Sequence, residues 1–97
     1  MSPFIALVHK DADSAYGLTF PDAPGCFSAA DAFDEIFAKA EEALAVWADG
    51  VRDDGREVPR ARDLVALKAD PAWADSFEGA DLVIAVPAPF KADLRAA

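Results

Sequence analysis

The sequence predicts an α+β fold: a three-stranded antiparallel β-β-β unit with one long helix on one face, then a short helical segment and a final strand. Three features predict it: short apolar runs near both ends, turn residues between the runs, and a switch to helical periodicity near residue 31. The chain has 97 residues, 54% of them hydrophobic, which suits one small domain. We expect this domain to span residues 1–90 and to be followed by a short tail, residues 91–97.

The first two strands are predicted by apolar residues on either side of a polar turn. Residues 4–9 form a short apolar run, and residues 10–15 contain Asp and Ser, whose side chains often bond the local backbone in turns. Residues 16–20 alternate large and small side chains, which is typical of a strand with one buried face. The two strands should pair as an antiparallel hairpin, and Pro21, which lacks an N–H, should end the second.

The next segment is predicted to turn and return as a third strand. Pro24 and Gly25 favour a turn, because glycine adopts a positive φ without a steric penalty. Residues 25–29 are then short enough to form a strand that returns along the hairpin.

A long amphipathic helix follows. Asp31 is a good N-cap residue, and Gly55 is suited to end the helix. Between them, apolar residues recur every three or four positions, which is the period of one helix face. This apolar stripe consists of Phe33, Ile36, Phe37, Ala40, Leu44, Trp47 and Val51. The residues expected to make most of the contact with the sheet are Phe33, Phe37, Leu44 and Trp47.

The remaining elements are short. Asp63 can cap a short helix that Pro71 should interrupt, and residues 81–86 are the clearest buried strand in the chain. Pro87 should end that strand.

Charge limits the classes of partner. The chain has 18 acidic and 9 basic side chains and a net charge of −9, which argues against direct binding to nucleic acid and suits a basic protein partner. The basic residues between positions 52 and 68 are interpreted as a solvated segment that neutralises nearby acids. No apolar run is long enough to span a membrane and the first residues do not resemble a signal peptide, so a cytoplasmic location is expected.

Two residues could support nucleophilic catalysis: Cys26, the only cysteine, and His9, the only histidine. A catalytic pair would require them to meet in space, with a third group orienting the histidine. A lone cysteine in an apolar context is more often a small buried hydrophobe. We therefore interpret Cys26 as a packing residue and expect no catalytic residue.

Several carboxylates precede or begin the long helix: Asp11, Asp13, Asp22, Asp31, Asp34 and Glu35. A metal-dependent nuclease needs such groups to converge on one point. Turn chemistry explains the first two, and helix capping explains those near residue 31. No calcium-binding loop spacing is present, and we expect neither a metal site nor a cofactor.

Residues 16–44 resemble the HicB-type antitoxin family, whose pattern is an aromatic strand, F-P-D-x-P-G-C, a polar link and a helix with E-A at intervals. The matching residues are Phe20, Pro21, Asp22, Pro24, Gly25 and Cys26, and on the helix Glu35, Ala40, Glu42, Ala43 and Leu44. The string is fairly specific, because prolines and a glycine at fixed offsets beside a strand and a helix rarely recur by chance.

The resemblance implies a partial RNase H-like fold, β-β-β-α-β, without nuclease activity. It also implies a small basic HicA-type toxin as partner, which cleaves messenger RNA and whose active surface the antitoxin covers. Many family members carry a C-terminal DNA-binding segment that represses their own operon. The chain departs from the family at Ala30 and Ala32, usually glycine and threonine, and its 97 residues leave no room for a DNA-binding unit. DNA binding is thus expected only with a further C-terminal segment.

We therefore expect a non-enzymatic antitoxin-like protein that neutralises a HicA-type toxin and forms a homodimer or a higher oligomer. Alternatives are a small enzyme or nucleic-acid-processing protein on an RNase H-like sheet, and a repressor of its own operon. Candidate partner contacts are the carboxylates of Asp22, Asp11 and Asp13. The structural motif comprises Phe20, Pro21, Pro24, Gly25, Cys26 and Asp31.

Overall fold

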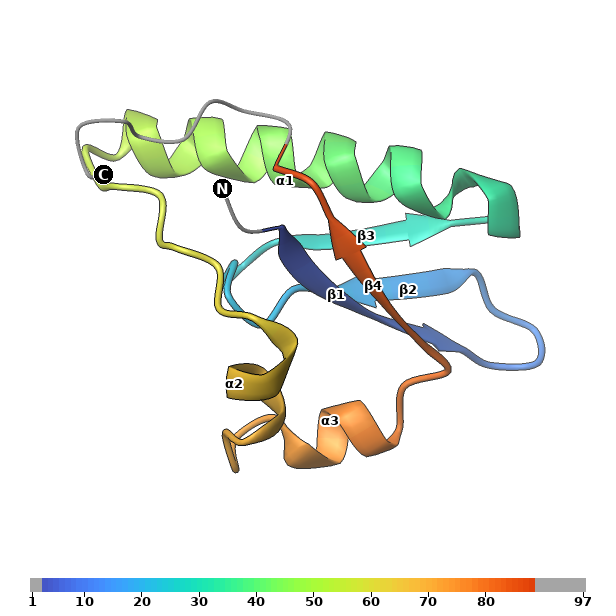
Figure 1. Ribbon diagram of the computed structural model, residues 1–97. Coiled ribbons are helices and arrows are strands. Elements are labelled where there is room, and N and C mark those ends of the chain that lie inside the picture. Colours follow the sequence, from blue (N-terminus) through green and yellow to red (C-terminus); the bar gives the residue numbers. More distant parts are fainter. Residues whose placement is uncertain (1–2, 89–97) are drawn as a thin grey trace.

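The computed structural model of the chain describes residues 3–88, so the expected tail at residues 91–97 lies outside the described residues. One four-stranded sheet has a long helix on one face and two short helices on the other (Figure 1). The strands are β1 (Phe4–Lys10), β2 (Tyr16–Thr19), β3 (Phe27–Ala30) and β4 (Leu82–Val86). The helices are a 3₁₀ turn, η1 (Phe33–Glu35), then α1 (Ile36–Asp53), α2 (Leu64–Lys68) and α3 (Ala74–Glu78). The predicted α+β class is confirmed.

The sheet order is β3-β2-β1-β4, and every neighbouring pair is antiparallel. β1 and β2 form the predicted hairpin, with His9 opposite Gly17. The last strand, β4, pairs with β1 on its other side, so that Phe4 lies opposite Val86. β1, an inner strand, and β4, an edge strand, are therefore neighbours in the sheet.

β1 is buried on both faces, which explains its unbroken apolar run. Side chains alternate between the faces of a strand. Phe4, Ala6 and Val8 accordingly belong to the main core beneath α1. Ile5 and Leu7 belong to a smaller core on the opposite face, which α2 and α3 cover.

α1 packs on the sheet through a stripe of buried residues about one turn apart: Ile36, Ala40, Leu44, Ala48 and Val51. Alanine at two of these positions lets the helix backbone approach the strands closely. The hydroxyl of Ser28 on β3 also donates a hydrogen bond to the carbonyl of Lys39 on α1, at 3.1 Å. The helix is thereby fixed over β3, the edge strand.

The helix does not begin as predicted. β3 continues to Ala30, so the chain turns at residues 31 and 32, and Ala32, in an extended conformation (φ −117, ψ 146), takes the N-cap position instead of Asp31. The N–H of Ala32 donates to the Glu35 carboxylate at 3.3 Å. Asp34 and Glu35 still place negative charge in the first turn, where the helix dipole favours it.

The predicted end of the helix is confirmed. Gly55 has a φ of 76°, a conformation that strains any residue with a Cβ. Its N–H donates to the carbonyl of Arg52 at 2.9 Å, and the N–H of Arg56 donates to the carbonyl of Val51 at 3.0 Å. These two bonds form a Schellman motif, which satisfies the last carbonyls of α1.

The prediction that Phe33 and Phe37 help to make most of the core contact between the helix and the sheet is wrong. Their exposed fractions are 65% and 53%, whereas Leu44 is fully buried and Trp47 is half-buried, as expected. The residues that make the contact at this end of the helix are Ile36 and Ala40, which are buried in the main core on either side of Phe37. The apolar stripe is therefore wider than the surface that the sheet covers.

The second face is covered by two short helices. Asp63 caps α2 as predicted, and its carboxylate accepts a bond from the N–H of Ala66 at 2.9 Å. Leu67 is fully buried against β1, and Trp73 and Phe77 pack around it. The sequence predicted only one helical segment here, because the second helix, α3, begins after Trp73 and has no side-chain cap to mark its start.

The sheet therefore has two different ends. At the closed end, the loop at residues 20–26 and the segment at residues 58–62 meet the C-terminal half of α1. At the open end, the turn at residues 11–15 lies at the same end of the molecule as the start of α1 (Figure 1).

Candidate functional site

The loop at residues 20–26 carries the F-P-D-x-P-G-C string and folds as two consecutive turns. The N–H of Ala23 donates to the carbonyl of Phe20 at 3.1 Å, and the N–H of Cys26 donates to the carbonyl of Ala23 at 2.9 Å. All three residues are at most 3% exposed and belong to the main core. Gly25 has a φ of 85°, as its place in the turn predicted.

α1 holds this loop through Trp47. The indole N–H donates to the carbonyl of Pro24 at 2.8 Å, and the ring packs edge-on against Phe4 with the centroids 5.9 Å apart. Trp47 thus combines apolar packing with a hydrogen bond to a loop carbonyl.

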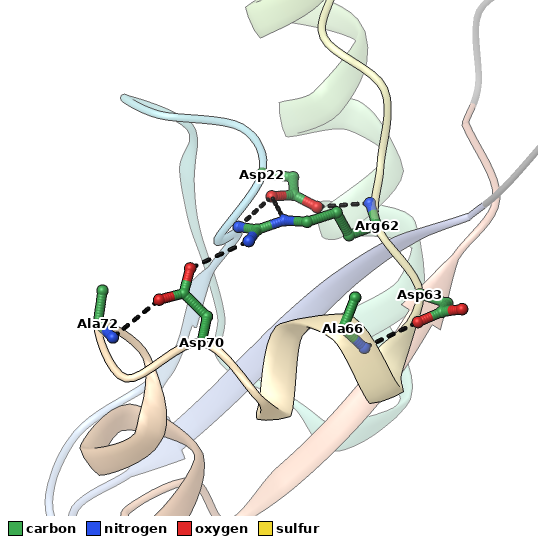
Figure 2. Close-up of polar contacts among 6 residues, drawn as sticks. All are labelled: Asp22, Arg62, Asp63, Ala66, Asp70 and Ala72. Atoms are coloured by element: carbon green, nitrogen blue, oxygen red, sulfur yellow. Dashed lines mark hydrogen bonds and ion pairs between the residues drawn. The ribbon is translucent and has the colours of Figure 1, made fainter.

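Asp22, at the centre of the loop and a candidate partner contact, is largely buried, since its side chain is 9% exposed. Figure 2 shows that both oxygens of its carboxylate are bonded to Arg62. The backbone N–H of Arg62 donates to Oδ2 at 2.6 Å, and the guanidinium contacts Oδ1 through Nε at 2.9 Å and Nη2 at 2.7 Å. Because this pairing uses both oxygens, Asp22 joins the loop to the segment that leads into α2.

Asp70 extends the network on the other side of the same guanidinium. Its Oδ2 lies 3.0 Å from Nη1 of Arg62, and its Oδ1 accepts the N–H of Ala72 at 2.9 Å (Figure 2). The Ala72 hydrogen bond, followed by Arg62, lowers the pKa of Asp70. Hydrogen bonds to Asp22 and then Asp70 raise the pKa of Arg62. The network joins three chain segments at the closed end.

Cys26 is placed as a packing residue. It is 3% exposed, and burial raises the pKa of its thiol from 9.0 to about 11, which favours the unreactive protonated form. His9 lies on β1, and β2 separates that strand from β3, next to Cys26. The structure does not bring the two side chains together as a catalytic pair.

Asp11 and Asp13 lie at the open end, far in the fold from Asp22. Ser14 organises their turn: its hydroxyl accepts the N–H of Asp11 at 2.9 Å, and its N–H donates to the Asp11 carbonyl at 3.2 Å. Both aspartates are exposed. The three predicted contact residues therefore do not form one site.

The described residues also bear on a metal site and on a membrane span. Within residues 3–88, no group of three or more His, Cys, Asp or Glu side chains is placed to hold a metal ion. None of the helices in this range has both the length and the apolar character that crossing a bilayer requires.

A family model described as the HicB-like antitoxin of the bacterial toxin–antitoxin system matches residues 4–88, which include both ends of the sheet. The chain belongs to this HicB-like antitoxin family. The resemblance seen in the F-P-D-x-P-G-C string is thereby confirmed.

Solved structures of HicB antitoxins share the fold of this HicB-like chain. A chain from a HicA3–HicB3 toxin–antitoxin complex is 27% identical with a TM-score of 0.69, over 88% of this chain and 95% of that one. The *Burkholderia pseudomallei* antitoxin HicB is 31% identical with a TM-score of 0.69, over 89% of this chain and 62% of that one.

The HicB-like chain is similar to only part of some longer relatives. It covers 95% of the N-terminal domain of *Burkholderia pseudomallei* HicB, at 30% identity and a TM-score of 0.62. An uncharacterised 14.9 kDa protein from the rep-hol intergenic region of Haemophilus phage HP1 is 32% identical over 63 residues, which are 65% of this chain and 47% of that protein. The chain thus spans about half the length of this phage relative.

Sequence reasoning missed the residues that complete the closed end of the HicB-like chain. Arg62 was grouped with a solvated basic segment, but it pairs with Asp22 across 40 positions of sequence. Asp70 and the indole bond of Trp47 were missed as well. The local sequence contains one sign of this role for Asp22: its carboxylate lies between two prolines, where there is no helix for it to cap.

Proposed function

We propose that this chain is a non-enzymatic antitoxin that binds and neutralises a small, basic, mRNA-cleaving toxin of the HicA type. One observation carries the proposal: the likeness to a chain of a HicA3–HicB3 toxin–antitoxin complex, which extends over 88% of this chain. Membership of the antitoxin family over residues 4–88 supports it.

The charge of the chain supports a basic partner. Its net charge is −9, and a partner of opposite sign would be attracted over long distances and held in a complementary orientation. Asp11 and Asp13, both exposed at the open end, are proposed as contacts with this partner.

The arrangement of reactive groups favours binding over catalysis. The thiol of Cys26 is buried and its pKa is raised to about 11, so it lacks the thiolate that nucleophilic attack requires. Asp22 is engaged by Arg62 at the closed end, whereas Asp11 and Asp13 lie at the open end. These carboxylates do not converge as a two-metal nuclease requires.

We also propose that residues 1–90 form a single HicB-like domain, that the chain forms a homodimer or a higher oligomer, and that it acts in the cytoplasm, where messenger RNA is found. The small size of the domain and its exposed apolar side chains support oligomerisation.

The test is reconstitution with a small basic protein of the HicA type, sought in the reading frame beside that of this chain. We expect the two proteins to co-purify, and we expect the chain to stop cleavage of messenger RNA by that partner as the two approach equal concentration. The chain alone should cleave no RNA with or without magnesium or manganese. Unchanged cleavage in the presence of excess chain would refute the proposal.

A further inference from the structure

Two phenylalanines at the start of the long helix are exposed at the open end, although Ile36 between them is buried. Phe33 and Phe37 lie one helical turn apart. They are on the same side of the helix as the residues that pack on the sheet toward its C-terminal end. Phe33 meets Tyr16 edge-on, with the ring centroids 6.0 Å apart. We call Tyr16, Phe33 and Phe37 the aromatic patch.

Burial within this fold accounts for Tyr16, which packs against the main core, but not for the two phenylalanines of the aromatic patch. The side chains of Phe33 and Phe37 are more than half exposed, and neither belongs to the cores on the two faces of the sheet. Exposed phenylalanines give up the hydrophobic stabilisation that burial would provide, and clustered apolar surface of this kind marks interaction sites.

The surroundings of the patch are acidic. Residues 10–16 and 31–37 together contain five carboxylates and one amine, a net charge of −4 (1 − 5 = −4). The carboxylates belong to Asp11, Asp13, Asp31, Asp34 and Glu35. All five residues are exposed, so the aromatic rings have an acidic rim. Apolar centres with charged rims are typical of protein interfaces.

The patch already binds one cation within the chain. The ammonium group of Lys10 lies 5.5 Å from the centre of the Tyr16 ring and donates to the carbonyl of Asp11 at 2.8 Å. The ring and the neighbouring oxygen therefore form a binding arrangement for a positively charged side chain.

We propose that the aromatic patch and its acidic rim are the surface on which this chain binds its basic protein partner. Lysine or arginine side chains of the partner would lay their carbon stems on Phe33 and Phe37 and direct their charges to the rim. This inference rests on the proposed antitoxin function and assigns that function to the open end of the sheet. The charge of the rim selects a basic protein over a second copy of this acidic chain.

Other exposed apolar side chains lie elsewhere in the fold and provide controls. Phe27 is 70% exposed on β3, and it faces away from α1, because the alternate residues Ser28 and Ala30 contact that helix or the core beneath it. Val46 on α1 and Val65 on α2 are 68% and 78% exposed.

The decisive experiment measures the affinity of the adjacent basic toxin by calorimetry. We expect the double variant Phe33→Ser, Phe37→Ser to bind about 30-fold more weakly or worse, the loss typical of truncated interface hot spots. Phe27→Ser is the matched control and should stay within about threefold of the unmodified chain. Thermal unfolding of each variant verifies that the fold is retained.

The outcomes distinguish a failure of the proposed antitoxin function from a failure of the proposed surface. If the unmodified chain binds no toxin, the proposed function fails and this surface fails with it. If it binds and the double variant binds equally well, or if Phe27→Ser causes the larger loss, the surface is wrong and the antitoxin function stands. If the double variant loses self-association by sedimentation and keeps its toxin affinity, the occupant is a second copy, and the proposal is overturned.

The rim is tested through association kinetics. Asp31→Asn, Asp34→Asn removes two charges beside Phe33, and Asp75→Asn, Glu78→Gln removes two charges from α3 on the far face. Only the first pair should slow toxin association several-fold at low salt and flatten its dependence on salt, because steering depends on charges near the contact. Equal effects from the two pairs would contradict a local rim.

Discussion

The two ends of the sheet are built from similar residue types and use them differently. At the closed end, a tryptophan and two aspartates find partners within the chain: Trp47 bonds the loop carbonyl of Pro24, and Arg62 links Asp22 to Asp70. At the open end, phenylalanines and aspartates face solvent. At the closed end, the contacts within the fold explain why these residue types are present. The open end keeps phenylalanines and aspartates that are largely exposed, although Glu35 there serves the start of the helix.

The largest difference is expected between two aromatic residues of α1. Trp47→Ala should lower the free energy of unfolding by about 3 kcal/mol, because it removes core packing against Phe4 and the bond to Pro24. Phe37→Ala should change it by less than about 1 kcal/mol, since its side chain is mostly exposed. Urea unfolding measures both, and similar losses would contradict the distinction between the ends.

The next difference concerns aspartates. Asp22→Ala should destabilise the fold by about 1–3 kcal/mol, because its carboxylate is almost fully buried and accepts bonds from Arg62. Asp13→Ala, in the exposed turn, should stay within about 0.5 kcal/mol of the unmodified chain. The midpoints of chemical unfolding curves give this comparison, and a cost at Asp13 equal to that at Asp22 would disprove it.

A smaller effect separates two glycines near the closed end of α1. Gly55→Ala should cost about 1 kcal/mol, because its φ of 76° is unfavourable for alanine. Gly50→Ala should instead stabilise the protein by about 0.5–1 kcal/mol, since it lies within the helix and an added Cβ would meet nothing within 4 Å. Thermal unfolding that shifts in the same direction for both variants would show that one of these backbone interpretations is wrong.

The smallest effect is a dependence on pH at Asp70. Its pKa is lowered in the folded state, chiefly by the N–H of Ala72 and then by Arg62. The stabilisation is therefore present above the ordinary carboxyl pKa of about 3.9 and is lost as the pH falls through the lower folded value. Stability should thus fall more steeply between about pH 5 and pH 2 for the unmodified chain than for Asp70→Asn. Parallel curves would exclude this contribution.

The sequence predicted the features that depend on local rules. Alternation identified the β1–β2 hairpin, the helical period identified α1, and single residues such as Gly55 and Asp63 identified a helix end and a helix start. The F-P-D-x-P-G-C string identified the family, because its turns need prolines and a glycine at fixed spacings.

Features that depend on distant segments were not predictable in this way. The helical period places Phe33 and Phe37 in the same apolar stripe as Ile36, but only the structure shows that the core covers Ile36 and leaves the two phenylalanines mostly exposed. The partner of Asp22 is 40 positions away, and no local rule links the two. Asp31 is not the N-cap residue that the sequence predicts, because β3 extends to Ala30 and the helix therefore begins later.

The pairing of β1 with β4 also sets the order in which the chain can fold during synthesis. Phe4 is translated before its neighbour in the sheet, Val86, which lies 82 positions later in the sequence (86 − 4 = 82). Until then, one edge of the most apolar strand is unpaired and prone to pair with other chains. A nascent chain that stalls before residue 82 would lack β4 and expose that edge, so synthesis through β4 is a precondition for the native sheet.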